Sequence, residues 1–360
     1  MISELIIPNF IIVKEGKMKV LRFLMIAALV TAMAAGSAVA AGQLFIYNWT
    51  DYTSPDLIKK FEKETGIKVT LDTYDSNETL LAKLKTGGGG YDIAVASNNF
   101  IPIMIKEGLL QRVNAAKLKG YDNIADKWKN PAWDPGNAYS IPWQTGTTSF
   151  AVDTAVYKGE INTFKVLFEP PPELQGKIGM LGAPHEVISF ANAYLGFKQC
   201  NDDPSKMKKV LDLLQKQKPY VKVYNSDGIK ERLVSGDVAI HQTWNGYAMR
   251  ARAEKPSIKY AYPKEGVISW MDNLVVPKGA KNLDSALKFF EFMMQPENAA
   301  LQSNFARYAN GIKGSEAFLD EELRTAPEII VPEGVEAIFI PVCSEKAIKL
   351  QDKVWTKLQQ

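Results

Sequence analysis

The sequence predicts an α/β fold divided into two lobes, and three observations lead to this prediction. Strand-like segments alternate with helix-like segments along the chain, as in a sheet covered by helices. The connections between these segments are short, so we expect a mostly parallel sheet. After an amino-terminal leader is set aside, roughly 320 residues remain, which is more than one hydrophobic core usually supports.

Local signals place the first strand, the first helix and the second strand. Residues 43–49 (QLFIYNW) have the pattern of a strand and are followed by a turn. Ser54 and Pro55 supply a helix N-cap and a first-turn proline, and Gly66 ends the helix. Residues 67–71 begin the next strand. The chain therefore opens with a strand–helix–strand unit.

The same order repeats in the next segment. Residues 76–85 have helical spacing, four glycines at 87–90 interrupt it, and residues 91–97 (YDIAVAS) form another strand. Ligands of such sheets bind beyond the carboxyl ends of the strands. The polar residues that follow the strands at 43–49 and 91–97 are therefore candidates for a ligand site.

Two later segments indicate where the chain passes between lobes. Residues 141–153 are apolar and β-branched, with Gly146 midway, and predict an extended connection. Strand and helix patterns continue after it, and the chain crosses back near residues 270–277.

Residues 1–41 have the composition of a leader that directs export. A basic region at residues 17–22 precedes an apolar stretch, and an Ala-Val-Ala sequence ends at Ala40. Small residues interrupt the apolar stretch, which favours cleavage near Ala40 over anchoring in a membrane. The residues before Met18 match no part of such a leader, so Met18 is an alternative start of translation.

The charge of the chain argues against a nucleic-acid partner. The formal net charge is +3, and residues 1–41 carry four basic and two acidic side chains. The remainder is close to neutral, at about +1. A strongly basic stripe, which nucleic acid requires, is absent from the sequence.

The sequence gives no reason to expect a metal or another cofactor. It contains two histidines, His185 and His241, and two cysteines, Cys200 and Cys343, without a CxxC or HExxH pattern. Export permits a disulfide. The separation of the two cysteines does not decide whether they form one or stay free.

Four predicted loops combine an aromatic residue with a carboxylate or an amide. They are residues 48–52 (NWTDY), 242–247 (QTWNGY), 269–272 (SWMD) and 306–310 (ARYAN). Ring faces attract organic cations, and carboxylates accept charge-assisted hydrogen bonds from ammonium groups. Each loop alone is better explained by core packing or turn formation. Together they favour a site for an organic amine.

Several motifs in one order extend this interpretation. They are NWTDYTSPDLIKKFEKETGIKV, DSNETLLAKL, YDIAVAS, YSIPW, HEV, NSD, WNG, PKEG-x3-WMD and a final WTKL. In these motifs, from Leu44 to Leu358, the chain resembles the periplasmic spermidine/putrescine-binding proteins of polyamine ABC importers. NWTDY and PKEG-x3-WMD are the most specific of them.

The resemblance implies an architecture and a function. The fold would be the two-lobed periplasmic-binding-protein fold (type II-like), with a mixed sheet flanked by helices in each lobe and a hinge near Gly146 and Asp272. The lobes would be built from residues 42–149 and 271–315, and from residues 150–270 and 316–360. A monomer in the periplasm would bind putrescine or spermidine and deliver it to an inner-membrane permease, without catalysis.

The resemblance also implies the ligand-binding residues. They are Trp49, Thr50, Asp51, Tyr52, Ser97, Glu186, Ser226, Trp244, Tyr247, Trp270, Asp272 and Tyr308. The aromatic residues would form a cage, and Asp51, Glu186 and Asp272 would accept hydrogen bonds from ammonium groups.

Departures from the resemblance predict an altered preference among amines. Relatives carry an aspartate where this chain has Gly182 and Ala183, and putrescine-selective relatives carry an acid at Tyr247. Asn99 replaces an aromatic residue of spermidine-preferring relatives. Each missing acid leaves a buried ammonium with less compensation for its lost hydration.

Two other functions are alternatives to amine binding. A hydrolase would need a catalytic set, for which His241 with Asp237, or His185 with Glu186, are weak candidates because no nucleophile motif accompanies them. A binding protein for an amino acid or another zwitterion would use an arginine, and Arg250 and Arg307 lie near the predicted walls in the sequence.

Overall fold

The computed structural model describes residues 42–360, and residues 43–360 form one compact unit. The predicted leader, residues 1–41, lies outside the described residues. Within residues 42–360, none of the helices combines the length and the apolar character that crossing a membrane requires.

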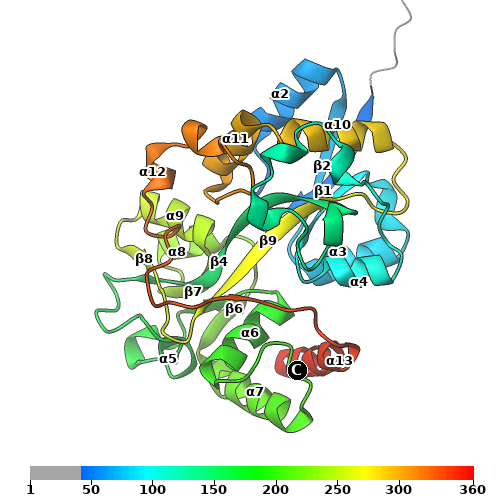
Figure 1. Cartoon of the computed structure of the whole chain (residues 1–360). Coiled ribbons are helices and arrows are strands. Elements are labelled where there is room, and N and C mark those ends of the chain that lie inside the picture. The colour runs from blue at the N-terminus through cyan, green and yellow to red at the C-terminus, as the bar shows by residue number, and fades with distance from the viewer. Residues whose placement is uncertain (1–41) are drawn as a thin grey trace, which may run out of the picture. The chain divides into compact units, whose positions relative to one another are not determined.

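A mixed sheet of ten strands runs through this unit. Figure 1 shows its long central strands β4 and β9 side by side. The main path through the sheet has the order β2-β1-β3-β9-β4-β7-β5-β6, with β8 paired to β4 and β10 paired to β9. The strands are β1 (Gln43–Trp49), β2 (Lys68–Tyr74), β3 (Ile93–Ser97), β4 (Ser140–Asp153), β5 (Ile178–Met180), β6 (Val221–Tyr224), β7 (Ile240–Trp244), β8 (Ile258–Tyr260), β9 (Val267–Val275) and β10 (Ala337–Phe339).

Helices accompany both halves of the sheet. Around β1, β2 and β3 lie α2 (Pro55–Thr65), α3 (Asn77–Lys85), α4 (Ile101–Lys106), α10 (Leu283–Met293) and α11 (Pro296–Ala306). The other half carries α5 (Lys165–Phe168), α6 (Pro184–Tyr194), α7 (Pro204–Gln217), α8 (Ile229–Ser235), α9 (Asn245–Glu254) and α13 (Glu345–Gln359). The short α12 (Glu321–Arg324) packs through Leu323 against Met249 of α9.

The predicted elements of the first half are confirmed, and their ends have local causes. The Ser54 side chain caps α2 by accepting a hydrogen bond from the amide of Leu57, and Gly66 ends the helix in the left-handed conformation. Ser76 caps α3 in the same way through the amide of Thr79. These caps fix where each chain segment leaves the sheet edge and enters a helix.

The sheet is mixed, as the resemblance implied, and its centre is not parallel as the alternation of strands and helices predicted. β1 runs parallel to β2 and β3, and β5 runs parallel to β6 and β7. The long strands β4 and β9 connect these two groups and are antiparallel to each other, to β3 and to β7. The chain crosses along β4 and returns along β9, so the middle of the sheet must be antiparallel.

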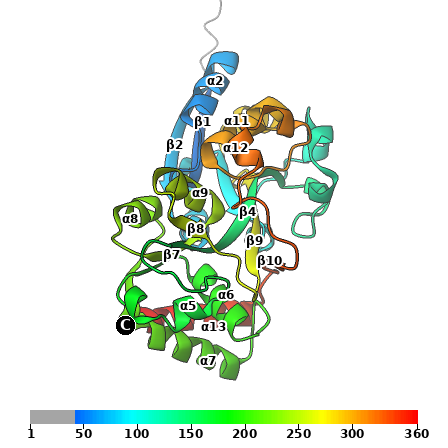
Figure 2. The same cartoon turned by 90° about the vertical axis from the view of Figure 1, so that its left-hand side faces the viewer.

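The carboxy-terminal segment packs on the half of the sheet that contains β5 and β6. β10 adds to β9, and α13 lies beside α6 and α7 (Figure 2). A disulfide joins Cys200, after α6, to Cys343, before α13. The question that the sequence left open is thus answered by a disulfide that links segments 143 residues apart.

Candidate ligand-binding site

A cavity lies at the carboxyl ends of β1, β2, β3 and β7 and beside β9. The lining residues are Trp49, Thr50, Tyr52, Tyr74, Asp75, Ser97, Glu186, Ser226, Asp227, Trp244, Tyr247, Trp270, Asp272 and Tyr308.

The structure brings eleven of the twelve predicted site residues together around this cavity. Asp51 is the one that does not line it. Asp51 is exposed, takes a left-handed backbone conformation (φ 54°), and accepts a hydrogen bond from Arg250 Nη1 at 3.4 Å through its carbonyl oxygen. The carboxylate of Asp51 therefore does not line the cavity.

Three lining residues were missed by the sequence analysis: Tyr74, Asp75 and Asp227. Tyr74 ends β2 and Asp75 follows it, at the same sheet edge as the ends of β1 and β3. The rule that ligands bind beyond the carboxyl ends of strands would have included both. Asp227 directly follows the predicted Ser226 in the turn before α8.

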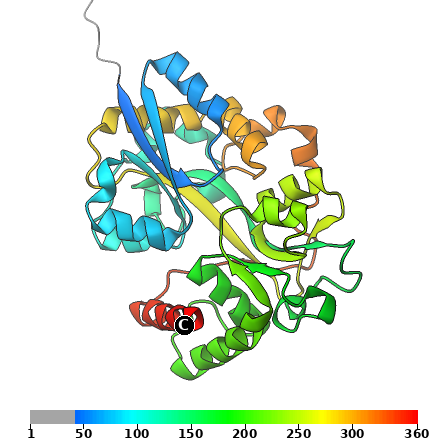
Figure 3. The same ribbon diagram turned by 180° about the vertical axis from the view of Figure 1, so that it is seen from behind.

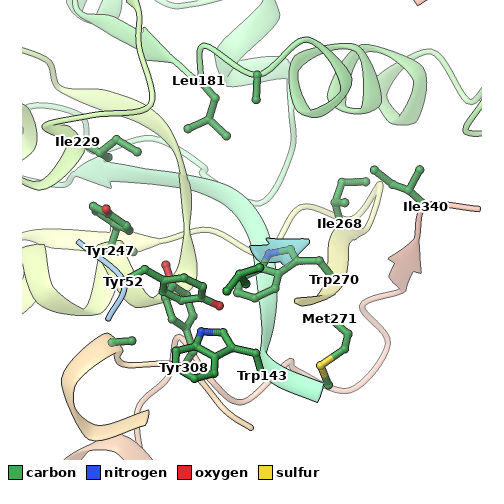
Figure 4. Close-up of a cluster of buried hydrophobic side chains, with 14 of the residues drawn as sticks. Tyr52, Trp143, Leu181, Ile229, Tyr247, Ile268, Trp270, Met271, Tyr308 and Ile340 are labelled. Atoms are coloured by element: carbon green, nitrogen blue, oxygen red, sulfur yellow. The ribbon is translucent and has the colours of Figure 1, made fainter. Parts of the chain in front are cut away.

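Aromatic rings form the walls of the cavity. Trp49 and Trp244 meet edge to face with their ring centroids 6.1 Å apart. Tyr308 packs edge to face against both Tyr52 (5.4 Å) and Trp270 (5.2 Å), a geometry that aromatic quadrupoles favour. Figure 4 shows Tyr52, Trp270 and Tyr308 gathered in one cluster. Trp143 packs edge to face against Tyr52 in the same cluster.

Two glycines permit these rings to pack against backbone. A β-carbon on Gly146 of β4 would lie 2.6 Å from the Trp270 ring, and one on Gly246 of α9 would lie 2.5 Å from the Tyr308 ring. Both separations are shorter than real carbon contacts. The absence of a side chain at each position thus fixes one wall of the cavity.

We expect Gly246→Ala to displace Tyr308, lower stability by about 1–3 kcal/mol through overpacking, and weaken ligand binding several-fold. Gly182→Ala is a matched control, because a β-carbon there would meet its nearest neighbours at an ordinary 3.6 Å. Chemical denaturation and titration of both variants would check this. Equal effects in the two variants would contradict the role given to Gly246.

Asp272 is the first of two buried carboxylates in the cavity. It lies on β9 opposite Ser97 of β3, with 5% of its surface exposed. Ser97 donates a hydrogen bond to Oδ1 at 2.6 Å, and the Tyr52 hydroxyl donates one to Oδ2 at 3.0 Å. Burial raises the pKa of Asp272 to about 7, against the opposing effect of these two donors.

Glu186 is the second buried carboxylate and lies in the first turn of α6. Its Oε1 accepts hydrogen bonds from Thr148 Oγ1 and Trp244 Nε1, both at 3.1 Å. Its Oε2 is buried and has no hydrogen-bond partner. Burial raises the pKa of Glu186. A buried carboxylate oxygen without a partner is costly, and a cationic ligand would supply the missing donor.

Two further acids stand nearer to solvent, and no described lining residue is a lysine or an arginine. Asp75 is half-buried and Asp227 is exposed. The turn that carries Asp227 is held by Arg232, whose guanidinium donates to the carbonyl oxygens of Asn225 and Asp227. The phenols of Tyr52 and Tyr308 stay neutral, because burial raises their pKa well above the usual value. The lining is therefore acidic and aromatic.

The candidate catalytic pairs do not form. His185 pairs with Glu78 and not with Glu186. His241 is buried, its pKa is lowered to about 3 by burial, and its ring contacts the Gln242 carbonyl oxygen and Arg232. Asp237 pairs instead with Lys222. Both cysteines are in the disulfide, so neither is a free thiol.

Neither arginine considered for a zwitterion lines the cavity. Arg250 stacks on the outer side of the wall, 4.2 Å from the ring centroid of Tyr247. Arg307 forms ion pairs with Asp320 and Glu322. The Tyr247 hydroxyl donates to the Thr50 carbonyl oxygen at 3.0 Å, which joins α9 to the turn after β1. Asn99 lies outside the cavity, in a neighbouring groove.

Two groups of parallel strands joined by long antiparallel strands, with an aromatic and acidic cavity at their ends, define the class of two-lobed solute-binding proteins. The chain belongs to the family of bacterial extracellular solute-binding proteins, whose family model matches residues 56–330.

Individual relatives cover most of the chain. It is similar to the putrescine-binding periplasmic protein SpuD of Pseudomonas aeruginosa (strain UCBPP-PA14), with 34% identity over 90% of this chain and 94% of the relative. It is also similar to the spermidine/putrescine-binding periplasmic protein of Escherichia coli (strain K12), with 38% identity over 76% and 78% of the two chains. The solved structure of the spermidine/putrescine ABC transporter substrate-binding protein PotD from Streptococcus pneumoniae has a TM-score of 0.72 and 30% identity, and it covers 88% of this chain and 98% of that chain.

Proposed function

We propose that this protein binds a small polyamine in the periplasm and delivers it to the permease of an ABC importer, without catalysing a reaction. One observation carries the proposal. The carboxylates of Glu186 and Asp272 are buried in an aromatic cavity, Glu186 Oε2 lacks a partner, and no lysine or arginine is among the described lining residues. An organic cation would satisfy the carboxylates while its methylene groups pack on the rings.

The named relatives support the same choice of ligand. SpuD is named as putrescine-binding, and the Escherichia coli relative is named as binding spermidine and putrescine. We assign ligand contacts to the eleven predicted residues that line the cavity and to Tyr74, Asp75 and Asp227. The carboxylate of Asp51 is left out because of its exposed position.

Closure would proceed by movement about the two long strands. We propose lobes of residues 42–149 with 271–315 and of residues 150–270 with 316–360. The boundaries after residues 149 and 270 fall within β4 and β9. Ligand contacts made from both sides would favour the closed form, which a monomer would present to the permease.

Calorimetric titration with putrescine, cadaverine, agmatine and spermidine tests the proposal. We expect at least one of these amines to bind, and an uncharged sugar or glutamate to give no heat. Binding of glutamate without binding of any amine would favour a zwitterion carrier and would overturn the proposal.

The affinity should depend on pH in a definite direction. Asp272 has a pKa of about 7 in the free protein, and an ammonium beside it would lower that pKa in the complex. Binding should therefore release a proton below about pH 7, with affinity falling by up to about tenfold per pH unit. Titrations in buffers of different ionisation enthalpy would count the released protons. An affinity that stays constant from pH 8 to pH 5.5 would contradict this prediction.

A further inference from the structure

A second groove lies next to the ligand cavity, and His185 belongs to the wall between them. The segments 75–78, 97–100 and 185–186 contribute residues to both spaces. Glu186 faces the cavity, whereas His185, one residue earlier in α6, lines the groove together with Glu78. Residues of these three segments therefore separate the cavity from the groove.

His185 is held tightly in this wall. Its side chain is 11% exposed, and its Nδ1 lies 3.0 Å from Glu78 Oε1 of α3. The Phe100 ring packs edge to face on the imidazole, with the centroids 5.3 Å apart. The second carboxylate oxygen of Glu78 is buried without a partner. One imidazole thus occupies the position beside Glu78 that an ammonium group of a ligand could otherwise take.

The surroundings favour the charged form of this imidazole. Burial alone would lower the pKa of His185, but Glu78, and more weakly Glu186 and Asp272, raise it to about 9. Asp352 of α13 and Lys85 of α3 line the same groove and complete the charged groups around it. Acids outnumber bases in this set, so His185 contributes a positive charge at neutral pH.

We propose that the imidazolium of His185, in the wall next to Glu186, takes the place of an ammonium group beside Glu78 and thereby restricts the site to diamines. Glu78, which lines the groove, is neutralised by His185, and the buried carboxylates that line the cavity are Glu186 and Asp272. A third ammonium group would meet this like charge and would have only the less buried Asp75 and Asp227 as partners, which contribute less than a buried acid. This inference rests on the proposed amine-binding function and names the ligand class within it.

Calorimetry of His185→Ala with putrescine and spermidine provides the test. Removal of the imidazole frees Glu78 and opens the wall toward the groove. We expect the ratio of spermidine affinity to putrescine affinity to rise by about tenfold or more, because one charge-assisted hydrogen bond becomes available to the triamine. His185→Gln keeps a hydrogen-bond donor without the charge and serves if the alanine variant does not fold. It should change the ratio in the same direction.

The double variant His185→Ala/Glu78→Gln is the matched control. It has the same open space but no carboxylate, so the gain for spermidine should disappear. An unchanged ratio in His185→Ala, or a gain that persists in the double variant, would overturn the role of His185. Failure of the unmodified protein to bind any amine would instead contradict the proposed function itself.

Nuclear magnetic resonance of the ring nitrogens tests the charge directly and without a ligand. The chain has two histidines, and His241 is held neutral by its low pKa. His185 should remain doubly protonated at pH 7.5 and lose its proton near pH 9. A neutral His185 at pH 7.5 would overturn the proposal even if the affinity ratio changed.

Discussion

Asp272→Asn should weaken putrescine binding by about 100-fold or more, because breaking a buried ion pair typically costs about 3–5 kcal/mol. The substitution keeps the size of the side chain and removes its charge. Asp272 accepts from both Ser97 and Tyr52, and an amide has only one acceptor oxygen for these two donors. The variant therefore loses the charge that faces the ligand. It also loses one of the two hydrogen bonds that hold the side chain in position.

Asp227→Asn is the control for this loss. Asp227 also lines the cavity, but it is exposed at the rim. Exposed ion pairs contribute up to about 1 kcal/mol, so its neutralisation should weaken binding less than about fivefold. Titration calorimetry of both variants at one pH measures the difference. Similar losses in the two would show that total charge, and not burial, determines the affinity.

Replacement of both cysteines by serine should lower the free energy of unfolding by about 3–5 kcal/mol. The disulfide joins residues separated by 143 positions, and the chain-entropy model gives about 5 kcal/mol for a loop of that length. Cys343 precedes α13, which packs beside α6 and α7. Without the bond, the carboxy-terminal helix depends on packing alone.

Ligand binding provides the control for the disulfide variant. Neither Cys200 nor Cys343 lines the ligand cavity. At 25 °C the double serine variant should bind putrescine with nearly unchanged affinity while it unfolds at lower denaturant concentration. A large loss of affinity with unchanged stability would mean that the disulfide acts on the site and not on the fold.

The sequence predicts the first half of the fold well because short-range chemistry determines it. Ser54, Gly66 and Ser76 are caps that act within a few residues, and the structure has the helix ends where these residues place them. Strand direction is different, because alternation and composition do not distinguish a parallel neighbour from an antiparallel one. β9 in particular is buried along its whole length, so no periodicity indicated that it begins at Val267.

The cavity residues show the same division between local and distant causes. Trp49, Trp244 and Tyr308 were predicted through resemblance, and the structure brings them to one cavity. Asp51 and Asp75 lie in two turns at the same sheet edge, yet only Asp75 lines the cavity. Which turn presents its carboxylate depends on backbone angles such as the positive φ of Asp51. The disulfide likewise depends on the distance in space between Cys200 and Cys343, which their separation in the sequence does not determine.

The close packing of Trp270 on Gly146 and of Tyr308 on Gly246 determines which partner loses conformational freedom on binding. Rings that touch backbone in the free protein have few rotamers left to lose, so the walls contribute little to the entropy of ordering. The conformational entropy lost on binding is then mainly that of the ligand, because the rotations of its methylene chain are restricted. Among diamines of equal charge and span, a rigid one should bind more tightly than a flexible one.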